Sequence, residues 1–262
     1  MSREVYCLRV DLGSPIAASD PYIHLDSFVS YAAGVEAIGH DGLAALPEGG
    51  DPEYFLDEMP FKRYSVGDEW VWATTAAGIA TADGLDIEER DRWSVTRWRK
   101  HFDDDPVHQI KETHVNTSSG SFKSYNAALP YAGADELTFF FEPAAGSDPE
   151  RVVELIERHV SGIGKKRSQG FGRIRDLDLV DATGAVASAL HHNGSLLRSV
   201  PASFATQVVP GTLIERRTVR PPYWHAANQA LAYTPFTDLD RSYLRPELAL
   251  GDEAVGPEST PA

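Results

Sequence analysis

The sequence has 262 residues, with 39 acidic and 24 basic side chains, and its formal net charge at pH 7 is −15. It contains no apolar run near the roughly 18 residues that a membrane-spanning helix needs, so we expect no membrane association. The single cysteine, Cys7, excludes an internal disulfide and fits a reducing cytoplasm, where we expect the protein to reside.

The acidic balance counts against nucleic-acid binding at first sight, but the charges are segregated along the chain. Residues 35–60 contain seven acidic residues and no Lys or Arg, whereas the basic residues concentrate in residues 90–100, 165–175 and 216–220. One face of such a molecule could bind a polyanion while another face stays solvated. The alternative is that the basic clusters pair with the acidic surface within the protein.

The first predicted elements are a strand and a helix. Residues 4–12 alternate between apolar and polar side chains, as in a half-buried strand, and Cys7 is predicted to be a small core residue rather than a nucleophile. A helix is predicted next, with Asp26 as its N-cap and Gly39 as its stop. The apolar stripe of this helix consists of Leu25, Phe28, Val29, Ala32 and Val35.

Residues 61–64 and 69–74 are predicted to be strands. Trp70 and Trp72 would lie on one face of the second strand, because alternate side chains of a strand point in the same direction. Two interpretations remain open for these rings: both pack in the core, or one of them stacks on a nucleobase.

Residues 85–130 form a basic and aromatic stretch that we interpret as a long insertion. Residues 90–101 carry five Lys or Arg and one acidic residue, and Trp93 and Trp98 are interleaved with them. Single-stranded RNA requires cations for its backbone and flat rings for its bases. The alternative is that the tryptophans dock the insertion onto the body while the arginines pair with the acids at 103–105. The candidate RNA-binding residues in this stretch are Arg92, Arg97, Arg99, Lys100 and Lys123.

The next predicted elements are a strand over residues 136–142, a helix over 147–160 and a strand over 173–180. With the earlier elements they give the order strand, helix, two strands, helix, strand, which is the ferredoxin-like order. We therefore predict an α+β protein with a ferredoxin-like (RRM-type) domain over residues 1–181, interrupted by the insertion at about 85–130.

A glycine-rich basic loop, residues 161–174, joins the second helix to the last strand. Four glycines fall within eleven residues, and residues 162–175 hold five Lys or Arg and no Asp or Glu. Glycine permits positive φ and close approach of a partner, and clustered cations in an acidic protein favour a phosphate chain as ligand. The alternative is a surface turn with solvated charge. The candidate residues are Gly162, Gly164, Lys165, Lys166, Arg167, Ser168, Gln169, Gly170, Phe171, Gly172 and Arg173.

Two familiar phosphate-binding motifs do not describe this loop. No Gly-Lys-Ser/Thr closes it, so it is not a mononucleotide P-loop. A helix precedes it and a strand follows it, which is the reverse of the dinucleotide-binding fingerprint.

The remaining chain is predicted to be a β-rich extension over residues 182–249 that packs on the first domain, followed by a disordered tail over 250–262. Residues 204–209 and 212–219 are predicted to form a hairpin around a Pro-Gly turn. The extension contributes three further candidates for contacting RNA phosphates, Arg216, Arg217 and Arg220.

An Arg-Pro-Pro-Tyr-Trp run occupies residues 220–224 of the extension. Its aromatic residues, Tyr223 and Trp224, have two open interpretations. They either stack on RNA bases or pin the rigid Pro-Pro segment to the body of the protein.

The order helix, basic glycine loop, strand resembles the glycine-rich loop of the RAMP superfamily, the RNA-binding subunits of CRISPR effectors. The His-Leu-Asp entry at residues 24–26 and the Arg-Pro-Pro-Tyr-Trp run resemble the Cas-five-like subunit of type IV effectors. At residue level the resemblance covers only these three segments. In position, residues 85–130 correspond to the thumb of that family, which crosses and kinks the guide RNA.

This resemblance implies a non-catalytic subunit of a type IV-like CRISPR ribonucleoprotein, which holds the 5′ region of the guide RNA (crRNA) and caps the backbone filament. Its implied partners are the guide RNA and the backbone and large subunits of the effector complex, with the target nucleic acid reached only through the guide. No cofactor and no metal ion are expected.

Two other functions stay open. The first is a Cas-six-type, metal-independent endoribonuclease that processes precursor crRNA with His24 or another histidine as general base. The competing interpretation of His24 is a helix-entry residue that bonds locally. The second function is a subunit that binds only partner proteins, with the glycine loop as a protein contact.

Overall fold

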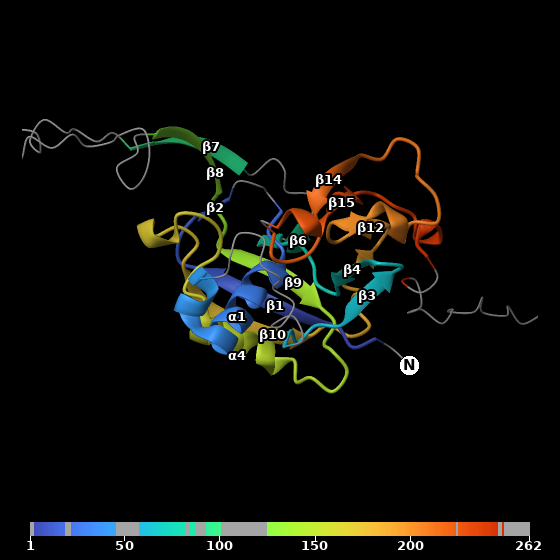
Figure 1. Cartoon of the computed structure of the whole chain (residues 1–262), viewed down its shortest axis with the longest axis horizontal. Helices are drawn as coiled ribbons and strands as arrows, with labels where there is room; N and C mark the ends of the chain where they lie inside the picture. Colours follow the sequence, from blue (N-terminus) through green and yellow to red (C-terminus); the bar gives the residue numbers. More distant parts are fainter. Residues whose placement is uncertain are drawn as a thin grey trace, which may run out of the picture.

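The computed structural model describes the parts of the chain drawn in colour in Figure 1. These are residues 3–18, 22–45, 58–81, 84–86, 93–100, 125–223, 225–245 and 248, with the backbone alone described at 78–81, 84–86, 93–100 and 125–128. Helices and antiparallel sheets are mixed along the chain, so the predicted α+β class is confirmed. The predicted tail at 250–262 lies outside the described residues.

The main sheet has five strands in the order β10-β1-β9-β5-β6, and every neighbouring pair is antiparallel. Their bounds are β1 Tyr6–Leu12, β5 Gly78–Thr81, β6 Gly84–Asp86, β9 Glu136–Phe141 and β10 Ile174–Asp181. The central strand β1 is the alternating segment that the sequence predicts, and Leu8 pairs with Phe139 on one side and Leu179 on the other. Cys7 is 7% exposed, which confirms it as a core residue.

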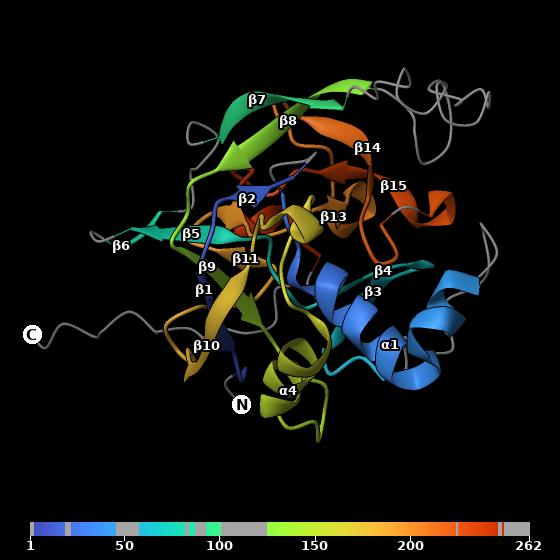
Figure 2. The same cartoon turned by 90° about the vertical axis from the view of Figure 1, so that its left-hand side faces the viewer.

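Two helices, α1 (Leu25–Ala45) and α4 (Glu150–His159), contact each other and lie together on one side of this sheet (Figure 2). Their apolar side chains enter the first hydrophobic core, where the ring of Phe28 meets Phe139 edge-on at 5.5 Å. The α4 helix begins after Asp148, whose side chain accepts a hydrogen bond from the Glu150 amide. This burial explains why the apolar stripes of both predicted helices were visible in the sequence.

The predicted ends of α1 need correction. The helix begins at Leu25, and Asp26 is not its N-cap, because its carboxylate is buried and contacts Arg198 and Tyr223. Gly39 does break the helical geometry, with φ 72° and ψ 171°, but the helix resumes and continues to Ala45. A positive φ is accessible to glycine at little steric cost, so the chain kinks here instead of stopping.

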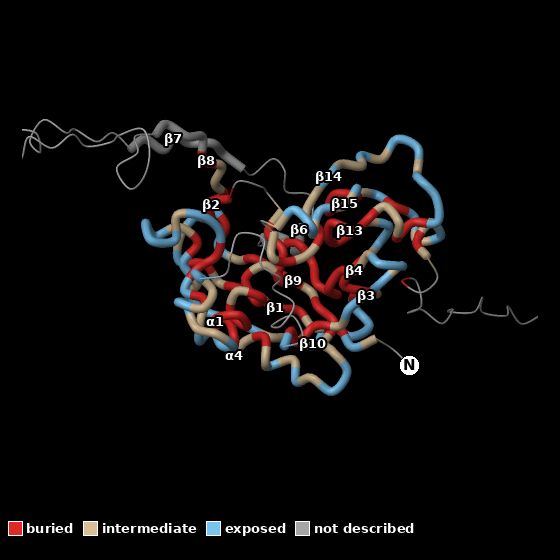
Figure 3. The backbone as a smooth tube through the Cα atoms, viewed as in Figure 1, coloured by how far each residue is buried: buried red, intermediate tan, exposed pale blue. Residues whose placement is uncertain are grey.

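A second hydrophobic core contains residues of the C-terminal part, together with Tyr64, Val71 and Ala73. Figure 3 shows buried positions both along β1 and β9 and in the region of β13 and β15. The elements of this region are β3 Arg63–Val66, β4 Glu69–Trp72, β11 His191–His192, β12 Ser195–Leu196, β13 Val200–Pro201, β14 Ile214–Thr218 and β15 Gln229–Tyr233. Four short 3-10 helices complete the elements of the described residues: η3 Arg167–Gln169, η4 Ala202–Phe204, η5 Ala226–Asn228 and η6 Arg241–Tyr243.

The predicted hairpin of residues 204–209 with 212–219 is wrong. β14 pairs with β15 instead, and Phe204 belongs to the turn η4, where its side chain is fully buried. The reason is burial: β15 supplies Ala232 and Tyr233, both with no exposed surface, whereas Val208 is 66% exposed.

The insertion forms part of a three-stranded sheet in the order β2-β8-β7. Its strands are β2 Ile16–Ala17, β7 Trp93–Lys100 and β8 Tyr125–Ala132. β7 and β8 pair along their whole length as an antiparallel ribbon, and Figure 1 shows this ribbon to one side of the main sheet.

Candidate nucleic-acid interface

The glycine-rich loop connects α4 to β10, as the sequence predicts, and its backbone lies against the segment between β1 and β2. The amide of Lys165 donates to the Ala17 carbonyl at 2.5 Å, and the amide of Gly172 donates to the Pro15 carbonyl at 2.9 Å. The amide of Arg173 donates to Ser14 Oγ at 2.9 Å. The loop is therefore held to the body by its own main chain, and most of its polar side chains remain exposed.

Three of the four loop glycines are required by close contact within the protein. A Cβ at Gly164 would lie 2.3 Å from the Ala17 carbonyl oxygen, and one at Gly172 would lie 1.9 Å from that of Ile163. A Cβ at Gly162 would lie 2.9 Å from the Gly172 carbonyl oxygen. Gly170 differs, because it has a φ of 92° but no atom within 4 Å of its ideal Cβ.

The amides of the loop are largely engaged as well. Eight of them donate to protein acceptors, namely those of Ile163, Lys165, Gln169, Gly170, Phe171, Gly172, Arg173 and Ile174. The sequence interpretation that the glycines allow close approach of a ligand is thus corrected at Gly162, Gly164 and Gly172, where the close partner is the protein backbone. Any contact of the loop with an anion depends chiefly on its cationic side chains.

Those side chains differ in their surroundings. Lys165, Arg167 and Arg173 are exposed, as are Ser168 and Gln169, whereas Lys166 and Phe171 are half-buried. The guanidinium of Arg167 lies over the ring of Tyr31, 5.6 Å from its centroid, and donates to the Gly162 carbonyl at 3.5 Å. Within the described part of the chain, the Lys165 side chain has no hydrogen-bond or ion-pair partner, so its charge faces solvent.

A cleft of about 1070 Å³ brings this loop together with the C-terminal basic cluster. One wall contains Gly162, Gly164, Lys165 and Arg167, and another contains Arg216 and Arg217 of β14. Residues of α1 and the segment before it supply the remaining surface, including Tyr22, His24, Phe28 and Tyr31. Two clusters that are about fifty residues apart in the sequence therefore face one cavity.

The second wall carries both a solvated and a paired cation. Arg216 is exposed, and among the described residues its side chain has no ion-pair partner. Arg217 donates to Glu215 Oε1 at 2.5 Å and lies over the ring of Tyr22, 4.8 Å from its centroid. Arg220 does not line the cleft: its Nε donates to Asn228 at 3.1 Å and its guanidinium lies over Trp70.

The other candidate residues are not gathered at the cleft by the described structure. Lys166, Ser168, Gln169, Gly170, Phe171, Gly172 and Arg173 belong to the loop but do not line the cavity. Arg97, Arg99 and Lys100 lie on β7 opposite Ala128, Asn126 and Tyr125, and only their backbone is described. Arg92, Lys123 and Trp224 lie outside the described residues, as do the acids at 103–105.

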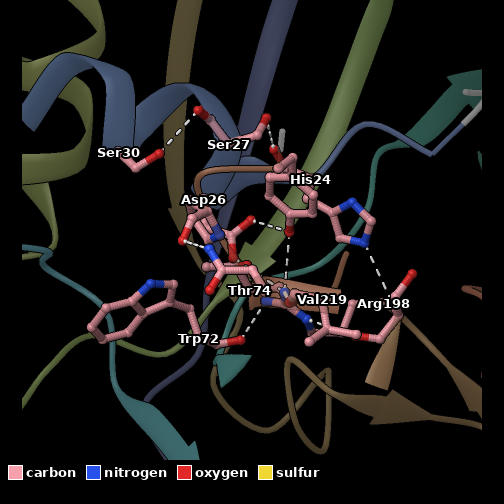
Figure 4. Close-up of polar contacts among 12 residues, drawn as sticks. His24, Asp26, Ser27, Ser30, Trp72, Thr74, Arg198 and Val219 are labelled. Carbon is pink, nitrogen blue, oxygen red and sulfur yellow. Dashed lines mark hydrogen bonds and ion pairs between the residues drawn. The ribbon is translucent and has the colours of Figure 1, made fainter. Parts of the chain in front are cut away.

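A buried polar network beneath the cleft was not predicted (Figure 4). Arg198 has no exposed surface, and its Nη2 contacts the equally buried carboxylate of Asp26 at 3.1 Å. Tyr223 donates to the other oxygen of that carboxylate at 2.9 Å. Arg198 also donates to the carbonyls of Trp72, at 2.5 Å, and Val219, at 2.7 Å. The one sequence signal was an arginine within the apolar run Leu196–Val200.

His24 lies beside this network and is 4% exposed. Its ring stacks on Tyr223 with centroids 5.2 Å apart, and its Nε2 accepts a hydrogen bond from the Ser199 amide at 3.3 Å. Burial, and then the charge of Arg198, hold the pKa of His24 well below its usual value. The backbone carbonyl of His24 accepts from Ser27, as the expectation of local bonding predicts, and the imidazole has a further partner, Ser199, in the C-terminal part.

The two tryptophans of β4 have different environments. Trp72 is 6% exposed and belongs to the first core, as one interpretation predicted. Trp70 is half-buried, meets Trp72 edge-on, and has the guanidiniums of Arg63 and Arg220 within 5.3 and 4.7 Å of its centroid. Cations of the protein itself thus already lie over its ring.

No group of three or more His, Cys, Asp or Glu side chains among the described residues is arranged to hold a metal ion. None of the helices in the same part of the chain has both the length and the apolar composition needed to cross a membrane.

The molecule is thus an α+β protein with a cationic, tyrosine-containing cleft between its glycine loop and its C-terminal sheet. Residues 7–235 match the family described as CRISPR type IV associated protein Csf3, and the chain belongs to this family. The resemblance to type IV CRISPR proteins inferred from the sequence is confirmed.

Among solved structures, the chain is similar to a subunit in a cryo-EM structure of the type III-B Cmr-beta complex bound to cognate target RNA. The two chains are 11% identical, with a TM-score of 0.35, and the match covers 69% of this chain and 62% of the other. The match therefore spans less than two thirds of that subunit. A comparison with curated proteins found no match.

Proposed function

We propose that this protein is a non-catalytic RNA-binding subunit of a type IV CRISPR effector ribonucleoprotein, in which it holds the 5′ region of the guide RNA. The observation that carries the proposal is the cleft in which the glycine loop and β14 face each other. Membership of a CRISPR type IV associated family supports the assignment to such a complex. The guide RNA and the backbone and large subunits are the proposed partners.

The electrostatics of the cleft support a phosphate-containing ligand. The protein carries a net charge of −15, yet Lys165 and Arg216 expose their charges at this cavity. Such cations are repelled by each other and gain from a polyanion, whose condensed counterions are released on binding. A cavity of about 1070 Å³ exceeds the usual range of small-ligand sites, roughly 300–1,000 Å³, and accommodates more than one nucleotide.

The strand order supports a ferredoxin-like plan for the first part of the chain. In that plan α1 follows β1, α4 connects β9 to β10, and β1 is central between β10 and β9. The first core contains only residues of the range 1–181, whereas the second combines residues of the range 182–249 with Tyr64, Val71 and Ala73. This supports a RAMP-type domain at 1–181 and an extension at 182–249 that packs on it. In this proposal the β7–β8 ribbon belongs to a thumb that contacts the guide RNA and caps the filament.

The surroundings of His24 support the absence of cleavage chemistry. A general base has to reach the proton that it removes. The Nε2 of His24 already accepts a hydrogen bond from the Ser199 amide, and its ring is stacked on that of Tyr223. Among the described residues, no second titratable side chain is hydrogen-bonded to its imidazole.

The test is to co-express the chain with the other proteins of its effector complex, purify the assembly and sequence the RNA that it retains. Wild type is expected to carry RNA of uniform length. The double variant Lys165→Ala/Arg216→Ala is expected to retain at least about tenfold less, because two solvated phosphate contacts are removed. Arg9→Ala is the matched control, since Arg9 is an exposed arginine on β1 that does not line the cleft.

Equal RNA content in wild type and the double variant would contradict the proposal. Metal-independent cleavage of repeat RNA that disappears in His24→Ala would favour an endoribonuclease instead. If nuclease treatment of the assembly leaves no protected RNA fragment, the protein is an assembly subunit that contacts only other proteins.

A further inference from the structure

One acidic side chain stands out in the cationic cleft. Glu215 of β14 lines the cavity next to Arg216 and Arg217, and its side chain is 41% exposed. A carboxylate is unfavourable beside a phosphate, because the two charges repel. A carboxylate is favourable beside the donor groups of a nucleobase, so Glu215 suits a base better than it suits the backbone.

The cleft also provides surfaces for a flat ring. A tyrosine with a guanidinium over it is present on each side: Tyr22 beneath Arg217 at 4.8 Å, and Tyr31 beneath Arg167 at 5.6 Å. The lining between them includes three apolar side chains that are at most 8% exposed. These are Ile23, Phe28 and Ile163. Aromatic rings and guanidinium planes are the groups on which unpaired RNA bases stack.

The orientation of Glu215 is fixed by its neighbour. Arg217 Nη1 donates to Glu215 Oε1 at 2.5 Å, which positions the carboxylate at the cleft. An ionised carboxylate has two oxygens with about four lone-pair sites. The bond to Arg217 therefore leaves enough acceptor capacity for two further donors.

We propose that this cleft binds an unpaired guanine, and that Glu215 reads it by accepting hydrogen bonds from the N1–H and the exocyclic amine. Guanine presents two adjacent donors on its Watson–Crick edge, which matches the two oxygens of a carboxylate. Adenine and cytosine present an amine next to a ring acceptor, and uracil presents one imide donor between two carbonyls. The inference rests on the proposed RNA-binding function and adds the identity of one base to it.

The experiment measures fluorescence anisotropy of the purified full-length protein with labelled ten-residue oligouridylates. Each RNA carries one central substitution, which is guanosine, inosine or adenosine. The guanosine RNA is expected to bind about tenfold more tightly than the adenosine RNA, within the roughly 5- to 150-fold range of a bidentate base contact. Inosine, which lacks the exocyclic amine, is expected to lie between them.

The decisive variant is Glu215→Gln, whose amide replaces one acceptor oxygen by a donor. Its preference for guanosine over adenosine is expected to fall below about threefold, while its affinity for the adenosine RNA stays equal or increases because a negative charge is removed. Glu157→Gln is the matched control, since Glu157 is an exposed glutamate on α4 outside the cleft. It is expected to keep the wild-type preference.

The outcomes separate this inference from the function on which it rests. Binding that depends on Lys165 and Arg216 but shows no guanosine preference would overturn the inference and leave the proposed function intact. Equal weakening of all RNAs in Glu215→Gln would also overturn it, since the residue would then only support the fold. If Lys165→Ala/Arg216→Ala leaves RNA affinity unchanged, both the guanine inference and the proposed function are rejected.

Discussion

At the scale of single residues, glycine has two different roles in the glycine-rich loop: one position needs only a positive φ, and another also needs close contact with the backbone. Gly170 has room for a side chain and needs only a positive φ, whereas Gly172 combines a φ of 62° with direct contact to the Ile163 carbonyl. The sequence predicted the position of the loop and its cations. It could not predict which glycines pack against backbone, because their partners include residues 15–17, almost 150 positions away.

This difference predicts unequal costs for two alanine substitutions. Gly170→Ala is expected to lower the free energy of unfolding by about 1 kcal/mol, the cost of a left-handed alanine. Gly172→Ala is expected to cost about 3 kcal/mol or more, because strain and a backbone clash add. Urea unfolding of both variants measures the difference, and equal costs would mean that the close contact between Gly172 and the Ile163 carbonyl is absent in solution.

At the scale of elements, β4 lies between the two hydrophobic cores. Val71 belongs to the second core and Trp72 to the first, as the alternation of side chains along a strand requires. Arg198 reinforces this junction by bonding the start of α1, the end of β4 and the segment after β14. The chain links these elements through contacts that no local pattern encodes, so neither the network nor the pairing of β14 with β15 was predictable.

Loss of this junction is expected to be costly. Arg198→Ala leaves the carboxylate of Asp26 buried without its guanidinium, and breaking such a pair costs about 3–5 kcal/mol. The substitution also removes the donor to the Trp72 and Val219 carbonyls. Thermal unfolding of Arg198→Ala beside Arg9→Ala measures the effect. Comparable melting temperatures of the two variants would show that the buried network contributes no more than a surface arginine.

The buried residues at this junction also make the stability of the fold depend on pH. Burial and Arg198 lower the pKa of His24 in the folded state, so the unfolded chain binds its proton more readily. The stabilising contribution is present above the unfolded pKa, about 6.5, and is lost as the pH falls below it. Asp26 acts in the opposite sense, because burial raises its pKa and favours its protonated form in the folded protein at low pH.

His24→Gln is therefore expected to unfold with a weaker dependence on pH between 8 and 5.5 than wild type. Melting curves across this interval measure the slope, while Asp26, Arg198 and Tyr223 stay unchanged in both proteins. An equal or steeper slope for His24→Gln would contradict the neutral, buried state of this imidazole.

At the scale of the whole molecule, the basic side chains of the cleft contrast with the negative net charge of the chain. The chain carries −15, but the cleft exposes lysine and arginine side chains from two distant segments. The acidic composition counts against binding of a polyanion, whereas the concentration of basic residues in a few segments is compatible with it. The sequence placed the loop and the C-terminal arginines in separate regions, because the approach of β14 to the loop depends on the packing of both cores.

If the proposed function holds, this arrangement sets the salt dependence of RNA binding. For single-stranded RNA, log Kd changes with log salt by about 0.7 for each neutralised phosphate. Lys165→Ala/Arg216→Ala is expected to reduce the slope by about 1.4 relative to wild type, since two contacts are lost. Anisotropy titrations at several KCl concentrations measure it, with Arg9→Ala as control. An unchanged slope would exclude both side chains from phosphate contact.

The positions of the cleft residues along the chain determine when the cleft can form during translation. Its lining comes from three successive stretches of the chain, and the last of them, on β14 and β15, extends to Gln229. A nascent polypeptide that ends before β14 possesses the glycine loop but only part of the cavity. The complete cleft therefore forms only after nearly all of the described chain has been translated, and a product that ends before β14 lacks Arg216 and Arg217 of its lining.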